Sequence, residues 1–180
     1  MTGRATWIVV ALLGLLAIAP RSRAQSAAVP VQLAGTWAYD GTREAEMHIV
    51  ERAFASTVAT LPELLQGFAR DRIRTDMEPP RRVIVALEGG RIRVTLERER
   101  RTTIDGTLGA AATTTGVADG MRVRSRLSGG WLEIAYEGEG SVLRQLLSTE
   151  PDGARMHLDY TVTGERLPQP VRYRLDFVHP

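Results

Sequence analysis

Gly35-Thr36-Trp37-Ala38-Tyr39, a short strand pattern that precedes a helical pattern running to Thr75, decides the fold of this chain. From Arg81 to Phe177, apolar residues then recur mostly at every second position, which is typical of strands. One strand, a helical hairpin and then a series of antiparallel strands is an order that constrains the architecture far more than it constrains the function.

The helical stretch divides into two predicted helices. The first begins after Asp40-Gly41-Thr42, where Asp40 or Thr42 can cap it. The second begins within Thr60-Leu61-Pro62-Glu63, where Thr and Glu have the spacing of a capping box. Spacings of three and four residues predict two buried faces, made of Met47, Val50, Phe54, Val58 and Leu61 in the first helix and of Leu61, Leu64, Leu65 and Phe68 in the second.

Three glycine-containing turns predict three β-hairpins. Gly89-Gly90 and Gly129-Gly130 fit two-residue turns, and Pro151-Asp152-Gly153 fits a type I turn followed by a left-handed residue. Closing the first hairpin on its turn places Val85 opposite Val94 and Arg82 opposite Glu97, so apolar pairs and opposite charges both match. A slip by one residue would destroy both kinds of pair.

The same alternation predicts which side chains face inward on the later strands. In the third hairpin the predicted inward set is Val142, Leu146, Met156, Leu158, Tyr160 and Val162, and in the last strand it is Val171, Tyr173, Leu175 and Phe177. This parity also turns Arg144 and Ser148 inward. An unpaired buried guanidinium is costly, so either an acid or a ligand meets Arg144, or a strand bulge turns it outward.

Residues 101–116 supply two more short strands in this interpretation, which brings the total to about ten. The predicted fold class is mainly β: a single antiparallel up-and-down barrel of about ten strands, with a helix-turn-helix lid after the first strand. Closure into a barrel is favoured because it leaves no exposed sheet edge.

The N-terminal residues predict export. Arg4, the apolar run from Trp7 to Ala19 and Ser22-Arg23-Ala24 have the order of a signal peptide over residues 1–24, cleaved before Gln25; an uncleaved N-terminal anchor is the alternative. We expect residues 25–32 to be a flexible linker and residues 33–180 to form a lipocalin-like barrel domain in the periplasm or outside the cell.

Cleavage would change the composition of the chain. It removes three arginines and no acid, so the formal charge falls from +2 to −1, and the main support for a nucleic-acid partner disappears. The apolar run is also shorter than the roughly 20 residues of a spanning helix, so the mature chain is predicted to have no integral membrane segment.

Gly35, Thr36 and Trp37, together with the order of elements over residues 33–178, resemble the calycin superfamily and, within it, the fatty-acid-binding proteins. That likeness implies helices that lid a cavity for a fatty acid or a similar ligand. It also implies that Trp37 helps to close the far end of the barrel beside a late arginine, either Arg172 or Arg174.

The chain departs from that family at the end of its last strand. The fatty-acid-binding proteins hold a carboxylate with an inward Arg-x-Tyr pair, where this chain has Leu175 and Phe177. The segment from Leu167 to Tyr173 also resembles the last strand of small secreted bacterial proteins of unknown function, a likeness that carries no activity.

The residues needed for common catalytic and metal sites are missing from the sequence pattern. There is no cysteine, no Gly-x-Ser-x-Gly motif and no phosphate-binding glycine loop. His48, His157 and His179 each lack a second ligand at helical or strand spacing. We therefore predict a protein that is not an enzyme and that needs no metal or other cofactor.

Two functions remain from the sequence. The first is a carrier or sensor of a small hydrophobic and uncharged ligand, with Tyr136, Arg144, Tyr160, Tyr173, Leu175 and Phe177 as candidate ligand-binding residues. Ser125 is a further inward polar residue. The second is a non-enzymatic structural or protein-interaction module of the cell envelope, whose barrel is filled by side chains, because barrels of this width can be hollow or packed.

Overall fold

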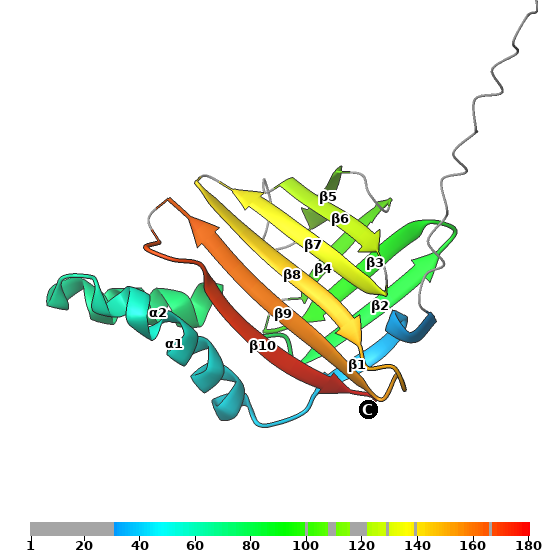
Figure 1. The fold of residues 1–180 in the computed structure, drawn as a ribbon, viewed down its shortest axis with the longest axis horizontal. Coiled ribbons are helices and arrows are strands. Elements are labelled where there is room, and N and C mark those ends of the chain that lie inside the picture. Colours follow the sequence, from blue (N-terminus) through cyan, green and yellow to red (C-terminus); the bar gives the residue numbers. More distant parts are fainter. Residues whose placement is uncertain are drawn as a thin grey trace, which may run out of the picture.

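The computed structural model describes residues 31–99, 101–107, 111–115, 122–128, 130–138, 140–165 and 167–180. The predicted signal peptide and most of the predicted linker lie outside these residues. Within them, ten strands close into one antiparallel barrel, and two helices follow the first strand (Figure 1). The predicted fold class is confirmed.

The strands follow one another around the barrel in chain order, and β1 completes the circle between β10 and β2. Their bounds are β1 Gly35–Tyr39, β2 Arg82–Glu88, β3 Arg91–Glu97, β4 Arg101–Thr107, β5 Ala111–Thr115, β6 Arg122–Ser128, β7 Trp131–Gly138, β8 Ser141–Thr149, β9 Arg155–Gly164 and β10 Val171–Val178.

The registers of the first two predicted hairpins are confirmed. In the first, Val85 lies opposite Val94 and Arg82 opposite Glu97. Gly89 and Gly90 have φ angles of 54° and 79°, the left-handed region that a two-residue turn requires and that glycine enters without strain. In the second hairpin, Leu127 lies opposite Leu132 and Arg126 opposite Glu133.

The predicted parity of β8 is wrong. Gln145 lies between Ile134 of β7 and Tyr160 of β9, so Leu143, Gln145 and Leu147 face inward, and Val142, Arg144, Leu146 and Ser148 face outward. Both parities of this strand carry apolar residues, so alternation alone could not choose between them. Arg144 shows which parity the strand adopts, because its side chain lies outside the barrel and is 63% exposed, with Nε 3.8 Å from Oε1 of Glu133.

The first helix, α1 (Arg43–Ala59), packs along β10 at one end of the barrel. Thr42 caps it, because the Thr42 hydroxyl accepts a hydrogen bond of 3.3 Å from the backbone N–H of Ala45. Val50, Phe54 and Val58 are buried as predicted, whereas Met47 and Leu61 are only half-buried. The same helix face buries Glu46, an acid that the predicted face did not include.

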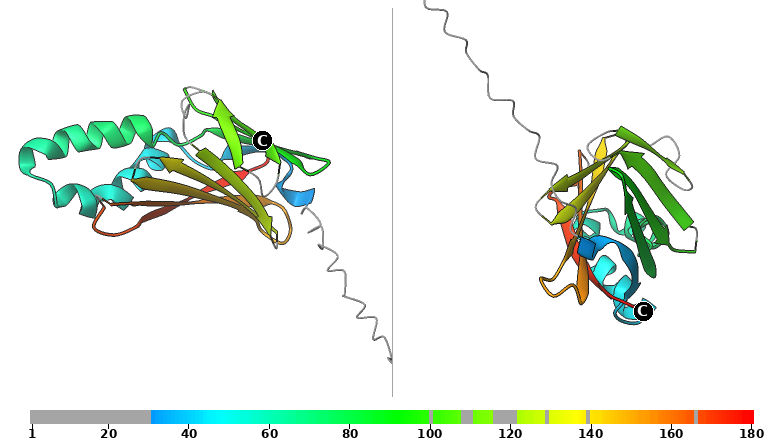
Figure 2. Two further views of the ribbon diagram at one scale, coloured as in Figure 1. Left: turned by 90° about the horizontal axis from the view of Figure 1, so that it is seen from above. Right: turned by 90° about the vertical axis from the view of Figure 1, so that its right-hand side faces the viewer.

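The prediction that α2 (Glu63–Asp76) buries an apolar face is wrong. Leu64, Leu65 and Phe68 are 95%, 51% and 72% exposed, and no residue of this fully described helix is buried. The helical hairpin extends beyond the barrel, so the first turns of α2 have no strand to pack against (Figures 1 and 2). The capping box is also wrong: α2 starts after Pro62 without a side-chain cap, and the Thr60 hydroxyl donates to the carbonyl of Thr57.

The opposite end of the barrel is closed by a 3-10 helix, η1 (Val31–Leu33), that precedes β1. Residues 31 and 32 are therefore structured, which shortens the predicted linker. Trp37 is fully buried and donates a hydrogen bond of 3.1 Å from Nε1 to the carbonyl of Leu33. Its aromatic partner is His179, with ring centroids 3.9 Å apart, instead of Arg172 or Arg174. In the described part of the chain, no helix is long and apolar enough to cross a membrane.

Candidate ligand-binding site

The two ends of the barrel interior differ in packing. At the η1 end, the inward apolar side chains have an exposed fraction of at most 1%: Leu33, Trp37, Met156, Leu158, Leu175 and Phe177. Leu175 and Phe177, predicted to line a ligand cavity, instead belong to this packed end.

A row of inward polar side chains crosses the barrel between this packed end and the helices. The strand registers align Ser125 on β6, Gln145 on β8, Tyr160 on β9 and Tyr173 on β10, with Ile134 of β7 between the first two. The Tyr136 hydroxyl donates a hydrogen bond of 3.1 Å to Oε1 of Gln145. The rings of Tyr160 and Tyr173 stack with centroids 4.5 Å apart. We call these five polar residues, Ser125, Tyr136, Gln145, Tyr160 and Tyr173, the polar row.

Two polar atoms of this row have no partner among the described residues. They are Oγ of Ser125 and Nε2 of Gln145, and the hydroxyl of Tyr160 makes no well-formed hydrogen bond although Arg98 and Gln145 lie within reach of it. A buried polar atom left without a hydrogen bond costs about 1–3 kcal/mol, so several in one row are unusual. Outside the row, the buried hydroxyl of Thr102 on β4 also lacks a partner among the described residues. The row is therefore chemically prepared for an additional hydrogen-bonding partner.

Burial keeps the tyrosines of the row neutral. Desolvation raises the pKa of Tyr136, Tyr160 and Tyr173, because a phenolate would lose its hydration in the barrel. Arg98 and Gln145 lie close enough to the Tyr160 hydroxyl to offset part of that rise. At neutral pH the row thus offers hydroxyl and amide groups without a formal charge.

Two ionisable side chains approach the row from the helix end. Arg98 follows β3 and has a buried Nε without a hydrogen-bond partner in the described part of the chain. Glu46 projects from α1 with an exposed fraction of 1%, and its Oε1 also lacks a partner there. Burial raises the pKa of Glu46 to about 7, against the opposing influence of nearby arginines. Arg98 lowers the pKa of Tyr160 and Tyr173, and Glu46 raises it, so the two side chains act on these tyrosines in opposite directions.

An open cleft lies at the helix end of the barrel. It has a volume of about 620 Å³ and lies between the helices and the ends of β8 and β9; its lining includes Phe54, Ile73, Met77, Ser141, Val162 and Leu167. Val162 occupies the same face of β9 as Tyr160, two residues nearer the cleft. Tyr160 is thus the next inward side chain of β9 beyond the cleft, although it does not line the cleft itself.

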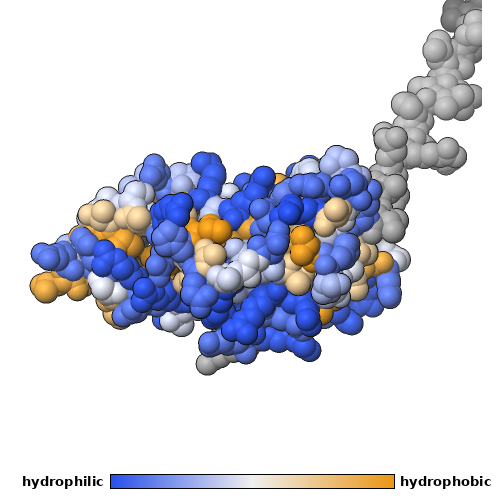
Figure 3. Space-filling model, turned by 90° about the horizontal axis from the view of Figure 1, so that it is seen from below, coloured by the Kyte–Doolittle hydropathy of each residue, from blue (hydrophilic) through white to orange (hydrophobic). Residues whose placement is uncertain are grey.

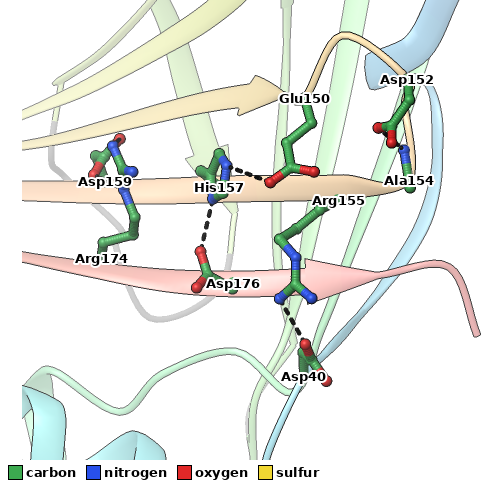
Figure 4. Close-up of polar contacts among 9 residues, drawn as sticks. All are labelled: Asp40, Glu150, Asp152, Ala154, Arg155, His157, Asp159, Arg174 and Asp176. Carbon is green, nitrogen blue, oxygen red and sulfur yellow. Dashed lines mark hydrogen bonds and ion pairs between the residues drawn. The ribbon is translucent and has the colours of Figure 1, made fainter.

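The outer face of β9 and β10 carries ion pairs (Figure 4). Asp176 Oδ1 lies 2.7 Å from Nδ1 of His157, and Glu150 Oε1 lies 3.5 Å from Nε2. Arg174 pairs with Asp159 across the two strands at 2.7 Å. Within the described residues, no group of three or more histidine or acidic side chains could hold a metal ion.

The structure distributes the predicted candidate residues over three places. It brings together Tyr136, Tyr160 and Tyr173, places Leu175 and Phe177 in the packed end, and leaves Arg144 outside the barrel. Sequence reasoning missed Gln145, Arg98 and Glu46. Arg98 continues the two-residue alternation of Ile92, Val94 and Leu96, and Glu46 precedes Val50, Phe54 and Val58 at four-residue spacing. Both patterns were available from the sequence.

The fold resembles those of several solved structures. Zebrafish ileal bile acid-binding protein complexed with cholic acid matches with a TM-score of 0.50 at 10% identity, covering 83% of this chain and 99% of that one. A mutant of the fluorescent protein UnaG matches with a TM-score of 0.52 at 14% identity over 83% and 97% of the two chains. A secretary abundant heat soluble protein from Ramazzottius varieornatus gives 0.52 at 14% identity over 83% and 96%.

At these identities the likeness establishes the fold alone. The chain shares the fold of these structures, an antiparallel barrel with two helices after the first strand, which is the order of elements that the sequence predicted. No protein-family model matches the sequence. No curated protein matches it either.

Proposed function

We propose that this protein binds a small, mostly apolar and uncharged molecule at the helix end of its barrel, with a hydroxyl or carbonyl oxygen of the ligand on the polar row. The observation that carries the proposal is the pair of unpartnered buried atoms, Oγ of Ser125 and Nε2 of Gln145, in the same row as the Tyr160 hydroxyl. Nε2 of Gln145 requires an acceptor, and the two hydroxyls can donate or accept. The apolar body of such a ligand would occupy the cleft beside Phe54 and Val162.

The charges near the row favour a neutral ligand. Arg98 contributes one positive charge, and the buried carboxyl of Glu46, which is negative when ionised, lies near it. An anionic ligand that paired with Arg98 would add a negative charge beside the Glu46 carboxyl, which is ionised at pH 8, and two like charges close together cost free energy. Since Arg144 points away, it cannot supply a second cation to the interior.

The test is competition between a long-chain fatty acid and its methyl ester for the purified protein at pH 8. We expect the ester to bind at least tenfold more tightly, a difference of about 1.4 kcal/mol. Tighter binding of the acid, lost on Arg98→Leu, would contradict an uncharged ligand and make Arg98 a carboxylate anchor. The matched control is Arg144→Leu, which changes an arginine outside the barrel and should leave both affinities unchanged.

The second candidate function is a side-chain-filled structural or protein-interaction module of the envelope. The complete burial of the inward residues at the η1 end favours it, and so do the exposed Leu64, Leu65 and Phe68 on α2. Apolar surface gathers over the helical end of the molecule, at the left of Figure 3. Failure of both the ester and the acid to bind would favour this module over the carrier.

We also propose that the chain is exported and acts outside the cytoplasm as a binding protein and not as an enzyme. The support for export is the order of Arg4, the apolar run to Ala19 and the small residues Ser22 and Ala24. The mass of the chain isolated from its source should correspond to a start at Gln25, and an intact Met1 start would contradict cleavage.

A further inference from the structure

Glu46 is the one ionisable residue among the buried residues of α1. Val50, Phe54 and Val58 continue the same face of the helix at four-residue intervals, and all three are buried. The Glu46 carboxyl is equally buried, with Oε1 unpartnered among the residues the structure describes. The face with which α1 packs on the barrel therefore contains a buried carboxylic acid at a position where an apolar residue is expected.

The basic group nearest along the helix pairs with other acids through one nitrogen, Nη2, while its buried Nη1 has no hydrogen-bond partner among the described residues. Arg43 lies one turn before Glu46, but its Nη2 is 2.6 Å from Glu78 and 3.8 Å from Glu99. The hydrogen bond to Glu78 raises the pKa of Arg43 and holds the guanidinium away from a full pairing with Glu46. An ionised Glu46 would thus be buried without a hydrogen-bonded cation.

Every element around Glu46 contributes a charged or titratable group. These groups are Arg43 on α1 itself, Glu78 and Arg81 between α2 and β2, Arg98 and Glu99 after β3, Tyr39 on β1, Tyr160 on β9 and Tyr173 on β10. The arginines favour the carboxylate and Glu78 opposes it, but desolvation outweighs them all and raises the pKa. The packing of α1 on the barrel, which we call the seated form, is consequently more stable when Glu46 carries a proton.

We propose that Glu46 is a proton-operated latch: protonated, it keeps α1 seated over the barrel mouth, and ionised, it loosens α1 and opens the way to the polar row. The role of the latch in ligand release rests on the proposed function, whereas the movement of α1 does not.

The direction of the pH effect follows from linkage. In the seated form the pKa of Glu46 is about 7, whereas an exposed glutamate has an ordinary pKa of 4.5. Because the open form has the lower pKa, it gains relative to the seated form as pH rises from about 4.5 to 7, and the gain is complete above that range. Acid therefore closes the mouth and neutral to alkaline conditions open it.

Hydrogen exchange of the full-length protein tests the latch without a ligand. After correction for intrinsic exchange, the protection of α1 amides should fall about tenfold or more between pH 5.5 and pH 8.5, while that of β3 should hold. In Glu46→Gln the protection of α1 should no longer depend on pH. Glu44→Gln is the matched control, because Glu44 is exposed on the same helix and should leave the wild-type fall in place. Equal protection of wild-type α1 at both pH values would overturn the latch.

A second measurement covers the case in which Glu46→Gln does not fold. Carboxyl NMR of the wild-type protein should show Glu46 titrating with a midpoint near 7, and a midpoint near 4.5 would overturn the latch. Dissociation of a bound long-chain alcohol, used as the probe, should be faster at pH 8.5 than at pH 5.5 in the wild type only. If α1 responds to pH but no alcohol binds, the proposed function fails and the latch stands.

Discussion

At the scale of residues, Gln145 and Arg144 are neighbours on β8 with opposite environments. Gln145 is fully buried in the polar row, and Arg144 lies outside the barrel. Because adjacent residues of a strand face opposite sides, a shift by one position exchanges a hydrogen-bonding group of the interior for a solvated charge. Whether β8 contributes a neutral amide or a cation to the interior is therefore decided by parity alone.

We predict that Gln145→Leu separates binding from stability. The substitution removes an unpartnered Nε2 but also deprives the Tyr136 hydroxyl of its acceptor, so the free energy of unfolding should change by less than about 1.5 kcal/mol. Binding of the methyl ester should fall at least tenfold, because a hydrogen bond to the ligand is lost. Denaturant unfolding and ester titration measure the two quantities. Unchanged affinity in Gln145→Leu would remove this residue from the binding site.

At the scale of elements, the two helices differ in how much they contribute to stability. The Phe54 side chain lies in the barrel core, whereas that of Phe68 on α2 is 72% exposed. We predict that Phe54→Ala lowers the free energy of unfolding by about 3–5 kcal/mol. Phe68→Ala should change it by no more than about 0.5 kcal/mol. Urea denaturation of the two variants checks this, and a similar loss in both would contradict the projecting position of α2.

The hairpins were predictable because several local signals agree. The Gly89-Gly90 turn, the apolar pair of Val85 and Val94 and the opposite charges of Arg82 and Glu97 all require one register. β8 was not predictable from alternation, because Val142 and Leu146 have the same apolar character as Leu143 and Leu147. The charge of Arg144, outside the barrel, should have outweighed that ambiguity.

The exposure of α2 could not be derived from its sequence. Leu64, Leu65 and Phe68 have the spacing of a buried face, but periodicity does not tell whether a neighbouring element is present to cover it. The polar row is similar, since it gathers residues from β6 to β10 that only the closed sheet brings into line. Its tyrosines were predicted from their inward parity, and its amide was missed with the parity of β8.

At the scale of the whole molecule, the barrel is packed at one end and has unsatisfied polar groups toward the other. The closed end holds η1, Trp37 and Phe177, so it anchors the fold. The helix end combines the open cleft, the polar row and the buried acid of α1. This asymmetry is what a carrier needs, because ligand exchange at one end then leaves the core at the other end undisturbed.

Native mass spectrometry of the protein purified gently from its own source tests the central claim most directly. We predict a complex heavier than the polypeptide by the mass of one small molecule, which is released on denaturation and identified as an uncharged apolar compound with a hydroxyl or carbonyl oxygen. The bare mass of the polypeptide, together with failure of the protein to take up a long-chain alcohol or ester afterwards, would contradict the carrier and leave a barrel filled by its own side chains.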